Sequence, residues 1–281
     1  MWHFPWKLTA TFVGGLLASP LLSKLLLPLV IEFQKRREIA VAARAVIQRQ
    51  LDPLLKAADE LQAKLRALAE EDFVEFCRMP GTELDSAELV NLCSTLYLMA
   101  QFWGRLELLR REAFHVELSR NRQGKMLQNF LRCLESKRVR LVDRAWQRAI
   151  GDSVILMNGS DFGILSFKSF VEQYETSERL RAWMRPLQEV LFETRYRRTR
   201  QRVLQYGVIM HALIDTLDPK HYTTNYRPPY PNKLSKRTKH ELIGRVFGIY
   251  LVEVRHPEKY TGALTRKNKG RRFNSTPFTR R

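Results

Sequence analysis

An apolar run from Leu8 to Ile31 constrains this chain most strongly, because its 24 residues hold a single charged side chain, Lys24. A helix of that length reaches about 36 Å, enough to cross a hydrocarbon core about 30 Å thick. Its large aliphatic and aromatic side chains favour insertion by about 4 to 8 kcal/mol in total, against about 2.5 to 3.5 kcal/mol for a central lysine. Lys24 lies off centre, so its ammonium can extend to the nearer interface. The run therefore predicts one membrane-spanning helix.

The residues on either side of this run indicate its orientation. Aromatic side chains precede it at positions 2, 4 and 6, where rings favour the headgroup layer. Consecutive cations follow it at positions 35 to 37, whereas only Lys7 stands in front. Because positive charge is retained on the cytoplasmic side of a membrane, we expect a single-pass membrane protein with a cytoplasmic C-terminal domain.

Two other interpretations of the run fit the sequence less well. A cleaved signal peptide would need a small residue two positions before the cut, but Leu16 and Leu17 stand there ahead of Ala18 and Ser19. A soluble core helix rarely needs so long an apolar stretch. We therefore expect residues 1–34 to be retained as an anchor, with the lipid bilayer as the partner of residues 8–31.

Beyond the anchor, apolar residues recur at alternating spacings of four and three, which is typical of a helix with one buried face. The positions flanking this stripe are mostly neutral, unlike those of a dimeric coiled coil, so an intramolecular bundle helix is favoured over a zipper. Pro53 either opens a new helix capped by Asp52 or kinks a continuous one. The stripe consists of Ile47, Leu51, Leu54, Ala58, Leu61, Leu65 and Leu68.

A second helix is predicted after Asp85 and Glu88, which are spaced as a capping box. The stretch from Leu89 to Gly104 carries no charge. Its sixteen residues are short for a membrane span and include polar side chains. We therefore expect a buried helix here rather than a second crossing.

The remaining periodic segments predict helices up to residue 217. One is expected from Met126 to Ile150, where Gly151 can end it. Others are expected over residues 167–174, 177–196 and 197–217. The fold class is therefore mainly α, with a cytoplasmic helical bundle over residues 35–218.

The least helical stretch lies between residues 151 and 166, where Asn158-Gly159 favours a turn and hence a loop or a small hairpin. Within it, Asp161-Phe162-Gly163 spells the magnesium-binding triplet of protein kinases. No glycine-rich phosphate loop, strand lysine or catalytic loop accompanies the triplet, so a turn is the favoured interpretation.

No other motif points to catalysis, a metal or a cofactor. His240-Glu241 begins a zincin-like pattern, but Gly244 occupies the position of the second histidine. His115 and His211 stand alone in helical segments and fit core or boundary positions better than catalytic ones. We therefore expect no cofactor and do not favour an enzyme.

The chain contains three cysteines, which cannot all pair with one another. Their spacings fit no metal knuckle, so Cys77, Cys93 and Cys133 are predicted to be buried and reduced. Reduced thiols agree with a cytoplasmic location.

Positive charge is the main remaining signal, since the formal net charge is +19. Guanidinium groups match phosphate and carboxylate in a bidentate manner, so an arginine cluster is a candidate anion site. The alternative is a solvated helix face paired with Glu189 and Glu193. The cluster consists of Arg195, Arg197, Arg198, Arg200 and Arg202.

The last 63 residues hold sixteen lysines or arginines against three glutamates, a net +13. Their prolines favour an extended linker, so residues 219–281 are predicted to form a largely disordered basic tail. Cations interleaved with aromatic rings suit nucleic acid, and the same cations suit an anionic lipid surface. The further candidate anion-binding residues are Arg266, Lys267, Lys269, Arg271 and Arg272.

These features predict a membrane-tethered interaction or adaptor protein whose basic tail binds a polyanion, either anionic lipid or nucleic acid. The bundle offers a further surface for a protein partner. The alternative is a tethered enzyme or toxin-like effector with an arginine-lined pocket near Asp152 and Asp161. That alternative requires the arginines and aspartates to converge in one cleft.

Overall fold

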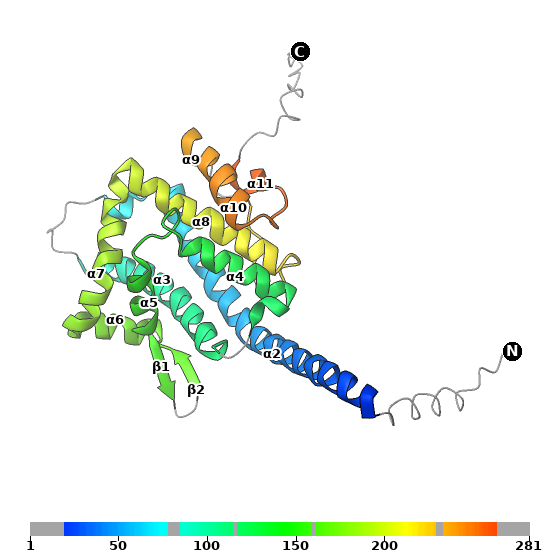
Figure 1. Ribbon diagram of the computed structural model, residues 1–281. Helices are drawn as coiled ribbons and strands as arrows, with labels where there is room; N and C mark the ends of the chain where they lie inside the picture. The colour runs from blue at the N-terminus through cyan, green and yellow to red at the C-terminus, as the bar shows by residue number, and fades with distance from the viewer. Residues whose placement is uncertain (1–19, 78–84, 115–116, 159–160, 229–232, 263–281) are drawn as a thin grey trace, which may run out of the picture.

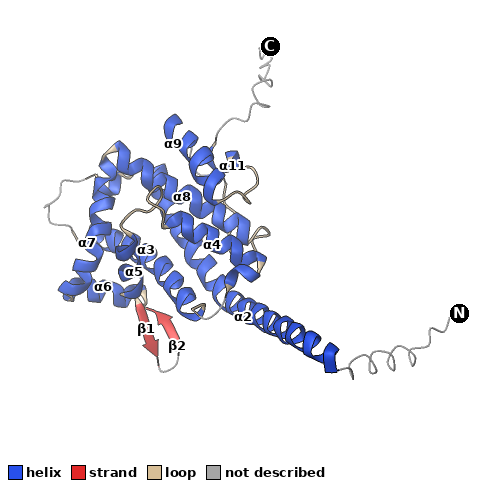
Figure 2. Ribbon diagram, in the orientation of Figure 1, coloured by secondary structure: helices blue, strands red, loops and turns tan. Residues whose placement is uncertain are grey.

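The computed structural model describes residues 20–77, 85–114, 117–158, 161–228 and 233–262. In this part of the chain, helices surround one hydrophobic core, and one small hairpin stands at its edge (Figure 2). The predicted mainly α class and helical bundle are confirmed.

The longest element is α2 (Pro20–Glu70), one helix that contains both Pro28 and Pro53. Pro53 therefore lies within a continuous helix rather than opening a new one. From Ala43 onward the predicted stripe is buried, with Leu54, Leu61 and Leu65 fully inaccessible. This burial confirms the intramolecular bundle helix.

The first part of α2 projects from the body of the molecule (Figure 1). Residues 28–42, here called the stalk, are exposed except for half-buried Ile39. No helix in the described part of the chain combines the length and apolar composition that a bilayer crossing needs. Residues 8–19 of the predicted span lie outside the described residues.

The second helix, α3 (Ser86–Glu112), begins at the predicted capping box, in which Asp85 and Glu88 each accept a hydrogen bond from the other's backbone N–H. It packs against α2 and α5 (Arg144–Asp152). Gly151 of α5 lies so close to α3 that an added Cβ would stand 2.8 Å from the Trp103 carbonyl oxygen. The uncharged stretch is thus a buried helix, as predicted.

The single helix predicted over residues 126–150 is wrong, because the structure has two. α4 (Arg122–Leu134) ends just before Glu135, and α5 begins after Asp143, whose carboxylate accepts from the Ala145 N–H. Between them, the Ser136 carbonyl accepts from the N–H groups of residues 139 and 140. This break turns the segment between the helices, residues 135–143, across the bundle.

The weakly helical stretch forms an antiparallel hairpin of β1 (Ile155–Asn158) and β2 (Asp161–Ile164). Asp161-Phe162-Gly163 is therefore part of a strand and not the predicted turn. α6 (Phe167–Thr176) and α7 (Glu178–Phe192) follow, each capped by a serine. A short 3-10 turn, η3 (Glu193–Arg195), then leads into α8 (Arg197–Leu217), whose second half is buried.

Structured residues continue past Asp218, over 219–228 and 233–262, where the sequence predicts a largely disordered tail. This segment contains α9 (Lys236–Glu241), the π-helical segment η4 (Leu242–Phe247), α10 (Gly248–Tyr250) and α11 (Glu258–Thr261). The physical reason is apolar burial, since these residues join the same core as α8: Leu234, Leu242, Val246, Phe247, Leu251, Val254 and Tyr260.

Polar contacts also bind this segment to the bundle. The Asp218 carboxylate accepts from the backbone N–H groups of residues 222, 223 and 224. Although burial acts in the opposite direction, these bonds lower the pKa of Asp218. Arg227 then donates two hydrogen bonds, of 2.8 and 3.0 Å, to the Asp59 carboxylate of α2.

The three cysteines are free thiols. Cys93 and Cys133 are buried as predicted, and burial raises the pKa of the Cys93 thiol to about 11. Cys77 is exposed, so its predicted burial is wrong. It follows Phe76, which occupies the core in its place.

Candidate anion-binding groove

A strongly basic concavity in the described part of the chain, here called the groove, has a volume of about 1450 Å³. Three segments form its walls: the turn between α4 and α5, the first half of α8, and α9. The lining residues are Lys137, Arg138, Arg140, Arg197, Arg198, Gln201, Arg202, Gln205, Ser235, Lys236, Arg237, Thr238 and Glu241.

The central wall is one face of α8. Residues 197, 198, 201, 202 and 205 line the groove, and these spacings place side chains on a single side of a helix. Arg202 donates to the carbonyl oxygens of Arg140, at 2.5 Å, and Leu141, at 3.3 Å. Burial, together with nearby Arg198, lowers the pKa of Arg202. Arg202 therefore fixes the turn wall against α8.

The α9 wall is held to α8 by Gln201. Its amide nitrogen donates to the Lys233 carbonyl at 2.9 Å, and its amide oxygen accepts from the Ser235 N–H at 2.7 Å. Ser235 also caps α9 by accepting from the Thr238 N–H. The relative positions of the three walls are thus set by two lining side chains of α8, Gln201 and Arg202.

The charges of the groove are poorly balanced. Arg140 forms an ion pair with Asp143, and Arg237 forms one with Glu241. The other exposed lining cations make no ion pair with any residue that the structure describes. These five, here called the free cations, are Lys137, Arg138, Arg197, Arg198 and Lys236.

The structure brings together three of the five clustered arginines and separates the other two. Arg200 points elsewhere and donates to the carbonyl oxygens of Thr194 and Arg195. The guanidinium carbon of Arg195 lies 4.8 Å from the ring centroid of Tyr196.

The alternative of a paired helix face requires partners for these arginines. Glu189 forms an ion pair with Arg185, and Glu193 accepts from Thr199. Among the described residues, neither glutamate forms an ion pair with the arginine cluster. The tail candidates Arg266, Lys267, Lys269, Arg271 and Arg272 lie outside the described residues.

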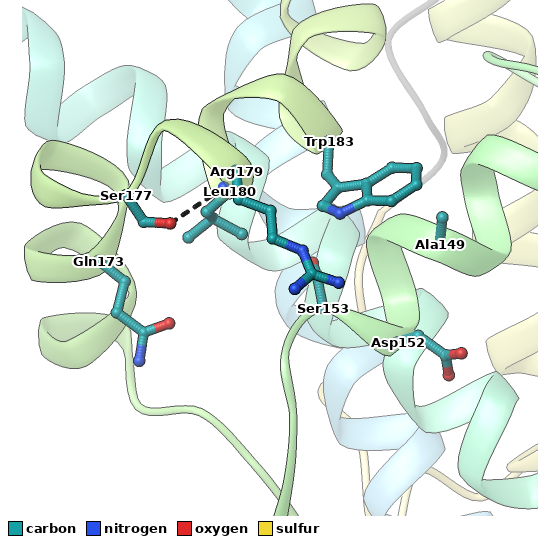
Figure 3. Close-up of a pocket in the computed structure, with 8 residues that line it drawn as sticks. All are labelled: Ala149, Asp152, Ser153, Gln173, Ser177, Arg179, Leu180 and Trp183. Atoms are coloured by element: carbon teal, nitrogen blue, oxygen red, sulfur yellow. Dashed lines mark hydrogen bonds between the residues drawn. The ribbon is translucent and has the colours of Figure 1, made fainter.

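A second, smaller pocket of about 430 Å³ lies between α5, α6 and α7 (Figure 3). It contains Asp152, Arg179 and Trp183, but none of the clustered arginines. Asp152 forms an ion pair with Arg111 at 2.7 Å, and Asp161 lies in β2, which packs on α3. The enzyme alternative requires the arginines and aspartates to converge in one cleft, and in this structure they do not.

The isolated histidine of α8 is a core residue. His211 is 2% exposed and lies beside Asp215 and the edge of the Tyr260 ring. Burial lowers the pKa of His211, although nearby Asp215 acts in the opposite direction. His115 lies outside the described residues. In the described part of the chain, no group of histidine, cysteine and acidic side chains is arranged to hold a metal ion.

Sequence reasoning missed two of the three walls of the groove. The signals were present as two short basic runs, Lys137-Arg138-Val139-Arg140 and Ser235 to Lys239. Each run is unremarkable alone, because surface charge is common. Only the fold brings both beside Arg197 and Arg198. No protein-family model, curated protein or solved structure matches the chain.

Proposed function

We propose that this protein is tethered to a membrane by its N-terminal apolar segment and binds a phosphate-rich polyanion through the groove. The five free cations of the groove support the binding role most directly. Three of them are arginines, whose planar donors match phosphate oxygens. The groove also exceeds the roughly 300 to 1,000 Å³ typical of sites for small molecules, so it suits an extended anion.

The tether rests on residues 8–31 and on the stalk that continues them. The apolar side chains of Leu29, Ile31 and Phe33 are 61%, 54% and 69% exposed. A cluster of exposed apolar residues on one element indicates a surface that contacts a membrane or a protein partner. In this proposal the bilayer covers them, the protein crosses the membrane once, and the bundle lies in the cytoplasm.

The basic residues beyond 262 contribute further cations to the same polyanion, and the bundle serves as an adaptor between membrane and ligand. Removing residues 219–281 would not test this proposal, since it would strip Val246, Phe247 and Tyr260 from the core. A cut after Gly262 leaves the described body complete.

Binding of inorganic polyphosphate tests the proposal. We expect the full chain to bind it at about 50 mM salt and to lose affinity by about 200 mM, where release of counterions from the five groove contacts alone accounts for about 500-fold. The triple variant R197Q/R198Q/K236Q should bind on the order of 100-fold more weakly.

The matched control is K168Q/R179Q/R185Q, which removes three exposed cations from α6 and α7. It should bind like the original chain. A chain cut after Gly262 should keep the groove-dependent part of the affinity. Equal binding by the two triple variants would overturn the assignment to the groove.

A further inference from the structure

We infer that the polyanion of the groove is the phosphodiester backbone of a nucleic-acid helix, and not the membrane to which the chain is tethered. This inference rests on the proposed function and specifies its ligand. Two observations carry it: the position of the groove along α2, and the chemistry of its walls.

The groove lies at the end of α2 that is remote from the tether. Gln201, which lines the groove, donates to the Lys233 carbonyl, and the Lys233 ammonium donates to the Glu70 carbonyl at 2.7 Å. The same ammonium forms an ion pair with Asp72 at 3.0 Å. Glu70 is the last residue of α2. The groove is therefore bound to the C-terminal end of this helix.

The length of α2 sets the distance from the tether. From Ile31 to Glu70 the helix rises by about 58 Å at 1.5 Å per residue. In Figure 1 the start of α2 and the α9 wall of the groove stand at opposite sides of the molecule. A helix that continues the membrane span thus carries the groove away from the bilayer surface.

Electrostatic attraction does not bridge that distance. At physiological salt the Debye length is about 8 Å, so the surface charge of the bilayer is screened well before the groove. Cations gain about 1 kcal/mol each from anionic lipid only near the surface. The free cations therefore face a polyanion that approaches from the aqueous side.

The walls favour a helical nucleic acid over an unpaired strand. Proteins that bind single strands stack bases on aromatic rings, and among the described residues none that lines the groove is aromatic. Apart from Glu241, which pairs with Arg237, the lining consists of cations, amides and hydroxyls, groups that contact phosphates and sugars. Free cations on three walls can contact phosphates on both sides of a bound backbone. These contacts position a duplex without reading its sequence.

The test uses the full chain reconstituted into neutral phosphatidylcholine nanodiscs. It is titrated with an RNA duplex of about 16 base pairs, a length that presents two successive minor grooves. The other ligands are a DNA duplex of the same sequence, the single RNA strand, and phosphatidylglycerol vesicles added separately. The variant R197Q/R198Q/K236Q is compared with K168Q/R179Q/R185Q, and K137Q/R138Q provides a second variant from another wall.

We expect the duplexes to bind more tightly than the single strand. R197Q/R198Q/K236Q should lose on the order of 100-fold in affinity for the duplexes, and K168Q/R179Q/R185Q should not. The ratio of RNA to DNA affinity then identifies the preferred helix. Tighter binding of the single strand, or groove-dependent binding of vesicles without duplex binding, would overturn this inference and leave the proposed function standing. Failure to bind any of these ligands would overturn the proposed function itself.

The distance from the bilayer is tested with the native thiol Cys77, which is exposed while the other two cysteines are buried. It lies close in sequence to Asp72, at the same end of α2 as the groove. A donor on Cys77 should transfer little energy to a headgroup dye, whereas a donor on Q34C in a C77S background should transfer efficiently. Equal transfer from both positions would place the groove against the membrane.

Discussion

Two arginine-rich regions of this molecule differ in what faces their guanidinium groups. In the interior network between α3, α4 and α5, Arg110 pairs with both Glu107 and Glu135, and Arg144 pairs with Glu135 at 2.8 Å. In the groove, the five free cations form no ion pair with any described carboxylate, and the one lining carboxylate among the described residues, Glu241, pairs with Arg237. The first arrangement holds helices together, and the second leaves charge available for a ligand.

The difference shows that the number of arginines in a segment does not decide its role. Burial of a charge without a partner is costly, so the partly buried Arg110 is accompanied by two carboxylates. Burial raises the pKa of Glu107, while the nearby Arg110 and Arg148 act in the opposite direction. The free cations of the groove are instead exposed to solvent. Substitutions should therefore separate stability from binding.

The largest effect on stability is expected from E135Q. The Glu135 side chain is 14% exposed and forms ion pairs with Arg110 of α3 and Arg144 of α5. Removing its charge leaves both arginines without this carboxylate partner. We expect a loss of about 3 kcal/mol in the free energy of unfolding, measured by urea denaturation. The control E189Q breaks an exposed pair on α7 and should cost less than about 0.5 kcal/mol. Similar losses in both would contradict a structural role for the network.

A smaller loss is expected from D59N, which weakens the attachment of the segment after Asp218. Asp59 is buried and accepts from both Arg227 and the Asn225 side chain. We expect a loss of about 2 kcal/mol in the free energy of unfolding, since a hydrogen bond to a charged group is worth about 1.5 to 3 kcal/mol, and faster proteolysis after residue 219. D52N provides the control, because the exposed Asp52 carboxylate of the same helix accepts a hydrogen bond of 3.3 Å from the Thr223 hydroxyl of this segment. Unchanged proteolysis in D59N would contradict this attachment.

How far the sequence predicts these features depends on how local their causes are. The stripe of α2 and the capping box of α3 follow from residues a few positions apart, and both were predicted. The break between α4 and α5 depends on the turn at Ser136 and the cap at Asp143, which outweigh the helical periodicity, so the sequence does not predict it. The folding of residues 233–262 required Phe247 and Tyr260 to find a distant core. The groove needed segments more than 90 residues apart along the sequence.

The pH dependence of stability is expected to show the smallest effect. Burial, with Lys259, Arg66 and His221 nearby, lowers the pKa of His211 below its usual 6.5 against the opposing effect of Asp215. Below about pH 6.5 the unfolded chain therefore binds a proton that the folded chain does not, and stability falls as the pH decreases. H211Q should flatten this part of the profile, as followed by urea denaturation between about pH 7 and 5. An unchanged slope would remove His211 from the acid response.

The salt dependence of binding tests the central claim most directly. Each cation that contacts a duplex phosphate contributes about 0.9 to the slope of log affinity against log salt concentration. We predict a slope for RNA duplex that becomes shallower by about 2.7 in R197Q/R198Q/K236Q, with the free energy of unfolding unchanged. K168Q/R179Q/R185Q should keep the original slope. The same slope in both variants would show that the free cations of the groove do not contact the polyanion.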